Sequence, residues 1–356
     1  MQQDRATLVL PPYTGVARFM DACYHRLPDA TPVWFMRQAG RSLAAYRALR
    51  ERYEMLTMIK TPELAAEVTL MPVQMLGVDA AVVYSDIMLP LEDMGVSFEI
   101  QHEVGPVIHH PLRTMQDIEE LQIPARGAIA QCMMDTIRLV RHELEGKQAV
   151  IGFAGAPFTL ACYLVEGRPS RDYRYAKAMM YSEPEIWHAL MDKLAHVTGE
   201  YLVAQIEAGA HVVQLFDSWI GALSPSVYQR FVQPYVRRIF DQVKQTGAPA
   251  IHFGTGTAAL LEAMAAAGGD IIGLDWHIDL DDGWRRVGFE RGIQGNLDPV
   301  LLLTSWPVIE TSARDILHRA TNRPGHIFNL GHGVLPPTDP DLLRRLVDTV
   351  HELTRR

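Results

Sequence analysis

The stretch Pro32-Val-Trp-Phe-Met-Arg-Gln-Ala-Gly-Arg41 guides the interpretation of the whole chain, because it joins an apolar run to a basic turn. Residues 34–36 have the length and character of a buried strand. Arg37 and Arg41 follow at once, with Gly40 between them. A guanidinium donates two parallel hydrogen bonds to one carboxylate or phosphate. The pattern therefore predicts a strand that ends in an anion-binding turn, and two solvated surface arginines are the simpler alternative.

Outward from this stretch, apolar runs of strand length alternate with helix-like segments. The run Asp79-Ala-Ala-Val-Val-Tyr-Ser-Asp86 is typical of a strand buried on both faces. Thr61-Pro62 predicts the start of a helix that runs toward Gly77. Residues 89–124 predict an insertion of loops that can include a hairpin. Further strands are predicted within 149–157, 210–218, 249–254, 270–276, 292–297 and 326–332, and further helices within 125–145, 182–208, 224–247, 258–267, 308–320 and from 339 onward.

Eight strands separated by helices predict an α/β protein built as a single (β/α)₈ TIM barrel, with an insertion after the second strand and one catalytic domain over residues 1–356. Function in such barrels lies at the C-terminal ends of the strands. We expect the polar residues found there to face one pocket: Arg37, Asp86, Asp217, Ser218, His252, Asp275, Asn296 and His332. For Asp217, Asp275 and Asn296, a role in capping a helix or a turn is an equally good interpretation.

Composition excludes several classes of protein. The net charge of −9 over 356 residues disfavours non-specific binding to nucleic acid or to anionic membranes. No run of 18 apolar residues occurs, and the first residues, Met1–Arg5, lack a signal-peptide pattern. Cys23, Cys132 and Cys162 have no CxxC spacing, which argues for reduced thiols. We therefore expect a soluble, cytoplasmic protein.

Two motifs point to other functions. Gly254-Thr-Gly-Thr-Ala-Ala259 follows a strand and precedes Asp275 by about twenty residues, as in a dinucleotide-binding fingerprint. It falls in the fifth of eight repeats, however, and the first half of a dinucleotide fold has no room before it. The pair His109-His110 lies in a proline-rich loop without further ligands at useful spacing, which argues against a metal site.

Longer motifs resemble one known family. Residues 32–41 and Gly152-Phe-Ala-Gly-Ala-Pro-Phe-Thr-Leu-Ala-Cys-Tyr163 are similar to the two signature motifs of the uroporphyrinogen decarboxylase family, and further matches are Tyr84-Ser-Asp-Ile87, Leu215-Phe-Asp-Ser218 and Asn329-Leu-Gly-His-Gly333. The resemblance covers essentially the whole chain. It implies a cofactor-free, metal-free barrel, usually a homodimer, that removes CO₂ from the four acetate side chains of uroporphyrinogen III. The product would be coproporphyrinogen III, in haem biosynthesis.

The resemblance also implies a site. Substrate contacts would be Arg37, Gln38, Ala39, Gly40, Arg41, Asp86, Tyr163, Ser218 and His332. Among them, Asp86, Arg37, Tyr163 and His332 would take part in catalysis. The residue types suit the substrate, since arginines can bind its carboxylates and Asp86 can accept hydrogen bonds from its pyrrole N–H groups. Arg37, His332 and Tyr163 all stay open as the proton donor.

Two functions from other classes remain. Relatives of this barrel transfer methyl groups from corrinoids with zinc held by His and Cys, but Cys23 and Cys132 lie away from the predicted strand ends and Cys162 stands alone. A non-catalytic carrier of tetrapyrroles or polycarboxylates would need the arginines, but the carboxylate of Asp86 would have no role in such an anion-binding site.

Overall fold

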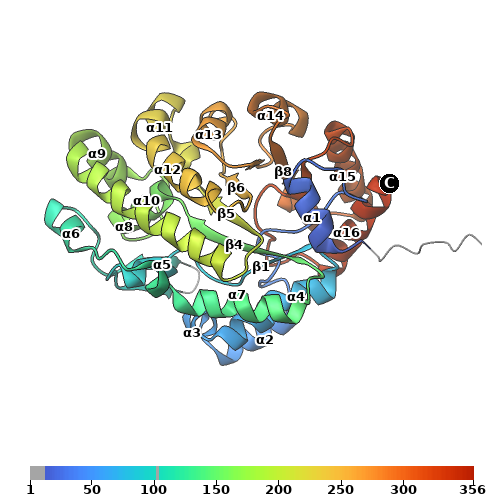
Figure 1. Ribbon diagram of the computed structural model, residues 1–356, viewed down its shortest axis with the longest axis horizontal. Coiled ribbons are helices and arrows are strands. Elements are labelled where there is room, and N and C mark those ends of the chain that lie inside the picture. The colour runs from blue at the N-terminus through green and yellow to red at the C-terminus, as the bar shows by residue number, and fades with distance from the viewer. Residues whose placement is uncertain (1–12, 102–103) are drawn as a thin grey trace, which may run out of the picture.

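The computed structural model describes residues 13–101 and 104–356, and a curled parallel sheet lies at its centre (Figure 1). The first residues, Met1–Arg5, therefore lie outside the described residues. Seven strands follow one another in the order β1, β4, β5, β6, β7, β8 and β9. Their bounds are β1 Ala80–Val82, β4 Ala149–Gly155, β5 Val212–Phe216, β6 Ala250–Phe253, β7 Ile271–Gly273, β8 Gly292–Leu297 and β9 His326–Leu330.

The predicted first strand is shorter than expected. Val33 forms an isolated parallel bridge with Phe328 of β9, and the N–H of Phe328 donates to the carbonyl of Pro32 at 2.9 Å. On the other side, the N–H of Asp79 donates to the carbonyl of Val33 at 2.9 Å. The chain turns directly after Met36, which leaves too few residues for a longer ladder. This segment thus fills the eighth position between β9 and β1, and the predicted TIM-barrel class is confirmed with seven regular strands.

Strand alternation separates two layers of core. Ile251 and Phe253 of β6 belong to an apolar cluster inside the curl of the sheet. The strands β1, β4, β5, β7 and β9 of the same sheet also contribute residues to this cluster, and β8 does not. His252, between them, faces outward and packs on Phe240 of α12, with ring centroids 5.1 Å apart. Phe19 of α1 enters the inner cluster next to the first residues of the strands. Helix α1 thereby closes the N-terminal end of the barrel.

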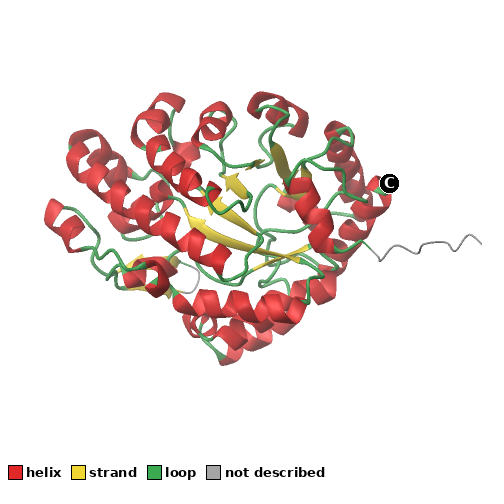
Figure 2. Ribbon diagram, viewed as in Figure 1, coloured by secondary structure: helices red, strands yellow, loops and turns green. Residues whose placement is uncertain are grey.

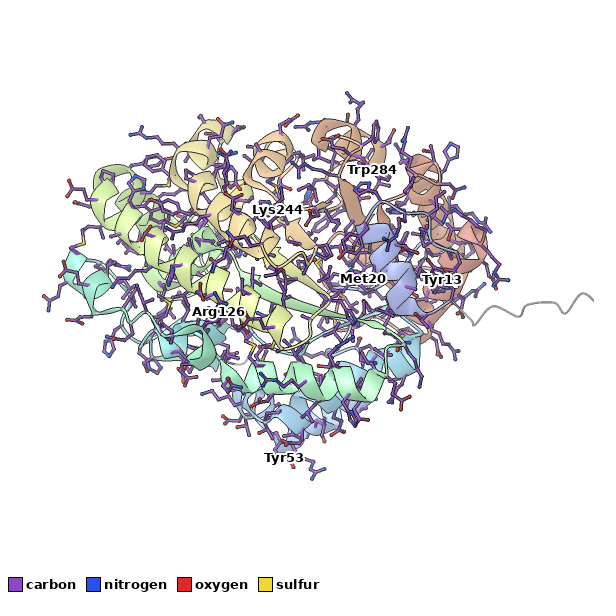
Figure 3. The ribbon with its side chains drawn as sticks, in the orientation of Figure 1. Tyr13, Met20, Tyr53, Arg126, Lys244 and Trp284 are labelled. Atoms are coloured by element: carbon purple, nitrogen blue, oxygen red, sulfur yellow. The ribbon has the colours of Figure 1, made fainter. Side chains whose placement is uncertain are left out.

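Helices cover the outside of the sheet (Figure 2). Their bounds are α1 Gly15–Cys23, α2 Ala44–Arg52, α3 Met55–Lys60, α4 Pro62–Leu76, α5 Leu89–Asp93, α6 Met115–Glu120, α7 Gln131–Leu144, α8 Pro157–Glu166, α9 Arg174–Ser182, α10 Pro184–Glu207, α11 Pro225–Phe231, α12 Gln233–Lys244, α13 Leu261–Ala267, α14 Leu280–Val287, α15 Trp306–Ala320 and α16 Pro340–Thr354, with 3₁₀ turns η1 Arg126–Ala128, η2 Ile220–Ala222 and η3 Pro299–Leu303. Trp284 of α14 is fully buried, 6.3 Å from the ring of His326 in β9 (Figure 3).

Proline positions explain several helix boundaries. Helix α4 starts at Pro62 and ends before Gly77, whose φ of 71° is left-handed, as predicted. The helix predicted over 224–247 is instead two helices, α11 and α12, that meet at Val232. The break has a physical cause, because Pro234 has no N–H with which to continue the hydrogen bonds of α11.

The predicted insertion after the second strand position is also present. Residues 89–124 contain α5, an antiparallel hairpin of β2 (Phe98–Gln101) and β3 (Gly105–Ile108), and α6. Helix α6 begins with a reciprocal capping box between Thr114 and Asp117. Within residues 13–101 and 104–356, no helix is long and apolar enough to cross a membrane.

Candidate active site

The turn after Met36 places two cations at the C-terminal end of the barrel. Arg37 adopts a left-handed φ of 59°, which is uncommon for a residue with a side chain. Gln38 holds this turn from inside: its Oε1 accepts from the N–H of Phe35 at 3.0 Å, and its Nε2 donates to the carbonyl of Ala80 at 2.9 Å. The fully buried side chain of Gln38 therefore supports the turn and does not face solvent.

Arg37 and Arg41 themselves are exposed. Within the residues that the structure describes, neither guanidinium pairs with a carboxylate. Ala39, between them, packs partly against the core. At Gly40, a Cβ would lie 2.9 Å from the carbonyl oxygen of Arg37, so the turn requires glycine there. The turn thus presents two cations whose charge is available to an anionic ligand.

Asp86 lies in the loop between β1 and α5. One carboxylate oxygen accepts a hydrogen bond from the N–H of Met88 at 2.9 Å. Burial raises the pKa of the Asp86 carboxyl, and the Met88 hydrogen bond and the charge of Arg37 only partly oppose that rise. This carboxyl is therefore destabilised when ionised, and further N–H donors would favour its charged form.

Tyr163 reaches the same end of the barrel from α8, the helix that follows β4. Its ring packs on Trp219, with centroids 4.3 Å apart, and Trp219 packs on Tyr173 at 5.1 Å. Burial raises the pKa of the Tyr163 phenol, and the nearby Asp86 raises it further. The hydroxyl is consequently protonated near neutral pH and can donate a hydrogen bond.

His332 follows β9 between two glycines. A Cβ on Gly331 would lie 2.6 Å from the backbone nitrogen of Trp276, so this loop packs closely against the loop after β7. Burial lowers the pKa of His332 to about 4, and the positive charge of Arg37 adds to the shift. The imidazole is therefore neutral near pH 7.

The charge of Arg37 links these groups into one site. It shifts the pKa values of Asp86, Tyr163 and His332, which reach the C-terminal end of the barrel from three different strands. Ser218 follows β5 next to Trp219, which packs on Tyr163. The structure thus brings a guanidinium, a carboxyl, a phenol and an imidazole together, and within the described residues Ser218 is linked to them only through its chain neighbour Trp219.

Asp217 and His252, which we expected to face the pocket, do not. Both side chains are fully buried, and His252 Nε2 lies 3.3 Å from an oxygen of Asp217. Both positions belong to the outer set of alternating residues, because Phe216 and Phe253 beside them point inward and pack together at 5.9 Å. That prediction was wrong for both residues.

Asp275 and Asn296 hold loops in place. The carboxylate of Asp275 accepts from the N–H of Gly256 and lies 2.8 Å from Nδ1 of His277. Asn296 donates to the carbonyls of Asp275 at 2.8 Å and of Ile278 at 2.7 Å. Their buried side chains therefore have the turn-holding role that was the alternative interpretation.

The two misleading motifs have local explanations. Residues 254–259 form the loop between β6 and α13, and Gly256 within it bonds to Asp275. His109 Nδ1 lies 2.9 Å from the hydroxyl of Ser97 in an exposed loop. In the part of the chain that the structure describes, no three His, Cys, Asp or Glu side chains are grouped to hold a metal ion. Cys23, Cys132 and Cys162 are free thiols.

A chain of hydrogen-bonded polar side chains inside the barrel was not predicted from the sequence. Trp34 Nε1 donates to Gln294 at 2.9 Å, and Gln294 donates to Gln214 at 3.0 Å. Trp219, the neighbour of Tyr163, was also missed. A glutamine in the middle of a buried strand is the signal that could have revealed the chain, since such a side chain needs an internal partner.

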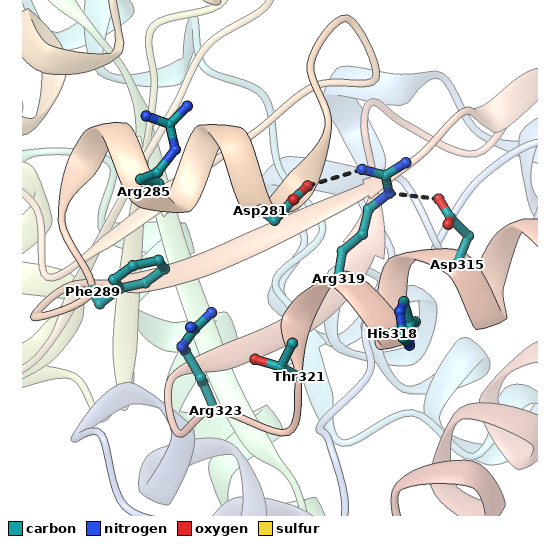
Figure 4. Close-up of a pocket in the computed structure, with 8 residues that line it drawn as sticks. All are labelled: Asp281, Arg285, Phe289, Asp315, His318, Arg319, Thr321 and Arg323. Carbon is teal, nitrogen blue, oxygen red and sulfur yellow. Dashed lines mark hydrogen bonds and ion pairs between the residues drawn. The ribbon is translucent and has the colours of Figure 1, made fainter.

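A separate hollow lies on the outside of the barrel, between α14 and α15 (Figure 4). It has a volume of about 500 Å³ and is lined by Asp281, Arg285, Phe289, Asp315, His318, Arg319, Thr321 and Arg323. Arg319 pairs with Asp281 and Asp315, and Arg323 packs on the ring of Phe289 at 4.1 Å. Two of the three arginines that line the hollow thus already contact other residues of its lining.

Comparison with known proteins agrees on one family. A family model described as "Uroporphyrinogen decarboxylase (URO-D)" matches residues 14–353. The chain is 53% identical to uroporphyrinogen decarboxylase of Sorangium cellulosum (strain So ce56) over 340 residues, which cover 95% of this chain and 97% of that protein. It is 50% identical to the protein of the same name from Streptomyces coelicolor over 346 residues, which cover 97% of each.

Among solved structures, a methyltransferase from Methanosarcina mazei aligns with a TM-score of 0.80 at 19% identity. The alignment covers 96% of this chain and 99% of that one. At this level of identity the likeness shows a shared fold and carries no argument about chemistry.

Proposed function

The chain belongs to the uroporphyrinogen decarboxylase family and decarboxylates uroporphyrinogen in tetrapyrrole biosynthesis, and from this premise we propose how its side chains do so. The reaction removes CO₂ from all four acetate side chains and yields coproporphyrinogen III. The observation that carries the proposal is the grouping of Asp86, Tyr163 and His332 within the field of Arg37.

Binding starts with charge. The substrate carries eight carboxylates, and Arg37 and Arg41 are exposed cations without carboxylate partners among the described residues. A close ion pair contributes roughly 4 kcal/mol at an effective dielectric near 20, before desolvation is subtracted. Gly40 gives the ligand access to the backbone, and Ala39 lines the turn. We assign Gln38 the task of holding Arg37 in place, because its own amide is used by Phe35 and Ala80.

Asp86 binds the centre of the macrocycle. Four pyrrole N–H groups can converge on one face of the flexible ring, and an ionised carboxylate accepts several hydrogen bonds at once. Burial raises the pKa of Asp86, which makes its charged form costly in the empty site. Each N–H donated by the substrate favours the charged form again. Substrate binding therefore completes the ionisation on which the next step depends.

The chemistry needs an acceptor for the electrons of the breaking C–C bond. Protonation of the ring carbon adjacent to the one that bears the acetate turns the pyrrole into an iminium-like cation, which takes up those electrons as CO₂ leaves. The exocyclic methylene that results then takes up a proton as the ring carbon loses one, which restores the pyrrole and leaves a methyl group. A propionate is one carbon too far for this path. Asp86 lies where the positive charge develops, so it stabilises the transition state more than the ground state. This chain requires no cofactor or metal for that step.

Tyr163, His332 and Ser218 hold the reacting side chain. The raised pKa of Tyr163 keeps its phenol protonated, and the lowered pKa of His332 keeps its imidazole neutral. Both groups therefore donate neutral hydrogen bonds to a substrate carboxylate near pH 7. Ser218 adds a third contact, through its hydroxyl, from the end of β5.

The assembly that we propose is a cytoplasmic homodimer in which the whole chain, residues 1–356, acts as one catalytic domain. The family supports the homodimer, and strands that span residues 80–330 in one sheet support the single domain. The net charge of −9 disfavours nucleic acid and anionic membranes as partners. Sedimentation equilibrium of the purified protein tests the dimer: a monomer at micromolar concentration would contradict it.

An anaerobic assay with uroporphyrinogen III and metal-stripped protein tests the reaction. We expect seven-, six-, five- and four-carboxylate products to appear in turn without any added cofactor, as resolved by chromatography after oxidation. A matched reaction with zinc and a methylated corrinoid serves as the control for methyl transfer. If carboxylates are lost only when zinc and the methylated corrinoid are present, the cofactor-free mechanism is refuted.

A further inference from the structure

We propose that Gly333 is a positioning residue for Arg37: the missing side chain at position 333 leaves the space in which the Arg37 side chain lies and from which its guanidinium faces the site. The inference rests on the proposed function, because it concerns the aim of a substrate-binding cation. It goes beyond that function by naming a residue that acts on Arg37 and was not among the predicted substrate contacts.

The first observation is steric. A Cβ on Gly333 would lie 2.7 Å from Cγ of Arg37 and 3.1 Å from its Cβ, and it would also collide with Cδ. Ordinary contacts between carbon atoms begin at about 3.5 Å. Gly333 does not have a positive φ, so an alanine would fit its backbone without strain. The collision with the Arg37 side chain is thus the specific consequence of adding a methyl group there.

The second observation is that the two backbones are tied together. The N–H of Val334 donates to the carbonyl of Met36 at 2.8 Å. The N–H of Met36 in turn donates to the side chain of Asn329 at 3.1 Å. Gln38 fixes the other side of the turn. Neither backbone can retreat easily, so a methyl group at position 333 has to move the Arg37 side chain.

The third observation is that Arg37 acts from its present place on three groups of the site. Its charge lowers the pKa of His332 and of Asp86 and opposes the rise in the pKa of Tyr163. Displacing the guanidinium weakens all three effects together. A displacement of about 1 Å in a binding group can reduce an enzyme's rate about 100-fold.

The test compares Gly333→Ala with Gly127→Ala, Arg37→Ala and the double variant Arg37→Ala/Gly333→Ala. Gly127 in η1 is the matched control, because no atom lies within 4 Å of an added Cβ there and its φ is not positive. We expect Gly333→Ala to lower kcat/KM about 10- to 100-fold, Gly127→Ala to leave it unchanged, and the double variant to be no worse than Arg37→Ala alone. Effects of the two single changes that multiply in the double variant would overturn the proposal.

A second readout does not depend on turnover. NMR titration of the His332 ring should show a pKa that rises from about 4 in Gly333→Ala, and adding Gly333→Ala to Arg37→Ala should cause no further rise. If Gly333→Ala fails to fold, a folded double variant supports the contact with Arg37, and an unfolded one overturns it. If Arg37→Ala has wild-type kinetics, the proposed function of Arg37 fails, and the titration alone decides whether the contact exists.

Discussion

Charged side chains lie at both ends of the barrel, and the two ends differ in how completely these side chains are paired with opposite charges. At the N-terminal end, Arg18 donates to Asp79 at 2.6 Å and to Asp29 at 2.7 Å, and His351 lies 2.8 Å from Asp79. At the C-terminal end, Arg37 and Asp86 have no ionic partner at bonding distance within the residues that the structure describes.

This difference separates charges that stabilise the fold from charges that serve a ligand. Asp79 is buried, yet Arg18, His351 and the N–H of Val33 together satisfy its carboxylate. Asp86 receives one hydrogen bond, from Met88, and burial raises its pKa. An incompletely satisfied carboxyl is costly in a folded protein. We infer that the chain tolerates this cost at the site because the substrate's N–H groups complete the coordination of Asp86.

The largest expected effect comes from Asp86→Asn. The amide keeps the shape and removes the negative charge, so we expect kcat to fall about 100- to 1000-fold, as when a preorganised electrostatic contact is lost. The free energy of unfolding should not decrease, because a neutral group suits this buried position better. Anaerobic turnover and urea denaturation measure the two quantities. Turnover near the wild-type rate would refute the stabilising role of Asp86.

Asp79→Asn tests the opposite end of the barrel. Removal of one partner from a buried ion pair leaves Arg18 without that charge, so we expect the free energy of unfolding to decrease by about 3 kcal/mol. The kcat of the folded protein should stay unchanged. Asp29→Asn is the matched control, since the more exposed Asp29 should contribute about 1 kcal/mol or less. Equal losses in both variants would contradict this ranking.

The pH dependence of the unfolding free energy should reflect two histidines that lie at opposite ends of β9. Burial lowers the pKa values of His326 and His332 to about 4, below the value of about 6.5 in an unfolded chain. The unfolded state therefore binds protons first, and stability is lost as the pH falls from about 6.5 toward 4. Each histidine adds up to about 1.4 kcal/mol per pH unit to this slope.

Substituting each histidine in turn separates the two ends. His326→Gln and His332→Gln should each flatten the pH dependence of the unfolding free energy, as followed by urea denaturation from pH 7 to 4.5. Loss of kcat/KM at pH 7 should accompany His332→Gln alone. If His326→Gln lowered kcat/KM equally after correction for folded fraction, the distinction between the two ends would not hold.

The smallest effect is expected for Arg319→Ala in the outer hollow of Figure 4. Arg319 pairs with Asp281 at 3.0 Å and with Asp315 at 2.7 Å, but these carboxylates are exposed. Such pairs contribute little, so we expect a loss of about 1 kcal/mol or less and unchanged kcat/KM. A change in kcat/KM of tenfold or more would mean that this hollow communicates with the site.

Much of the fold was predictable from local sequence. Buried runs such as residues 149–155 and 326–330 form strands, and prolines mark the starts of α4, α10 and α16. The split between α11 and α12 was missed because the helical period continues through Pro234. The shortened first strand was missed because the length of its ladder depends on where Arg37 turns, which Gln38 enforces from inside.

The amino-acid sequence by itself determined the order of strands and helices, the arginine turn and the likeness to one family, because periodicity, caps and long motifs are local properties. Tertiary structure decided which polar residues share the site. Asp217 and Ser218 are adjacent in the chain, but Asp217 points outward to His252 and Ser218 lies beside Trp219. Successive side chains point to opposite faces of a strand, so only the closed and curled sheet determines which of them meet the substrate.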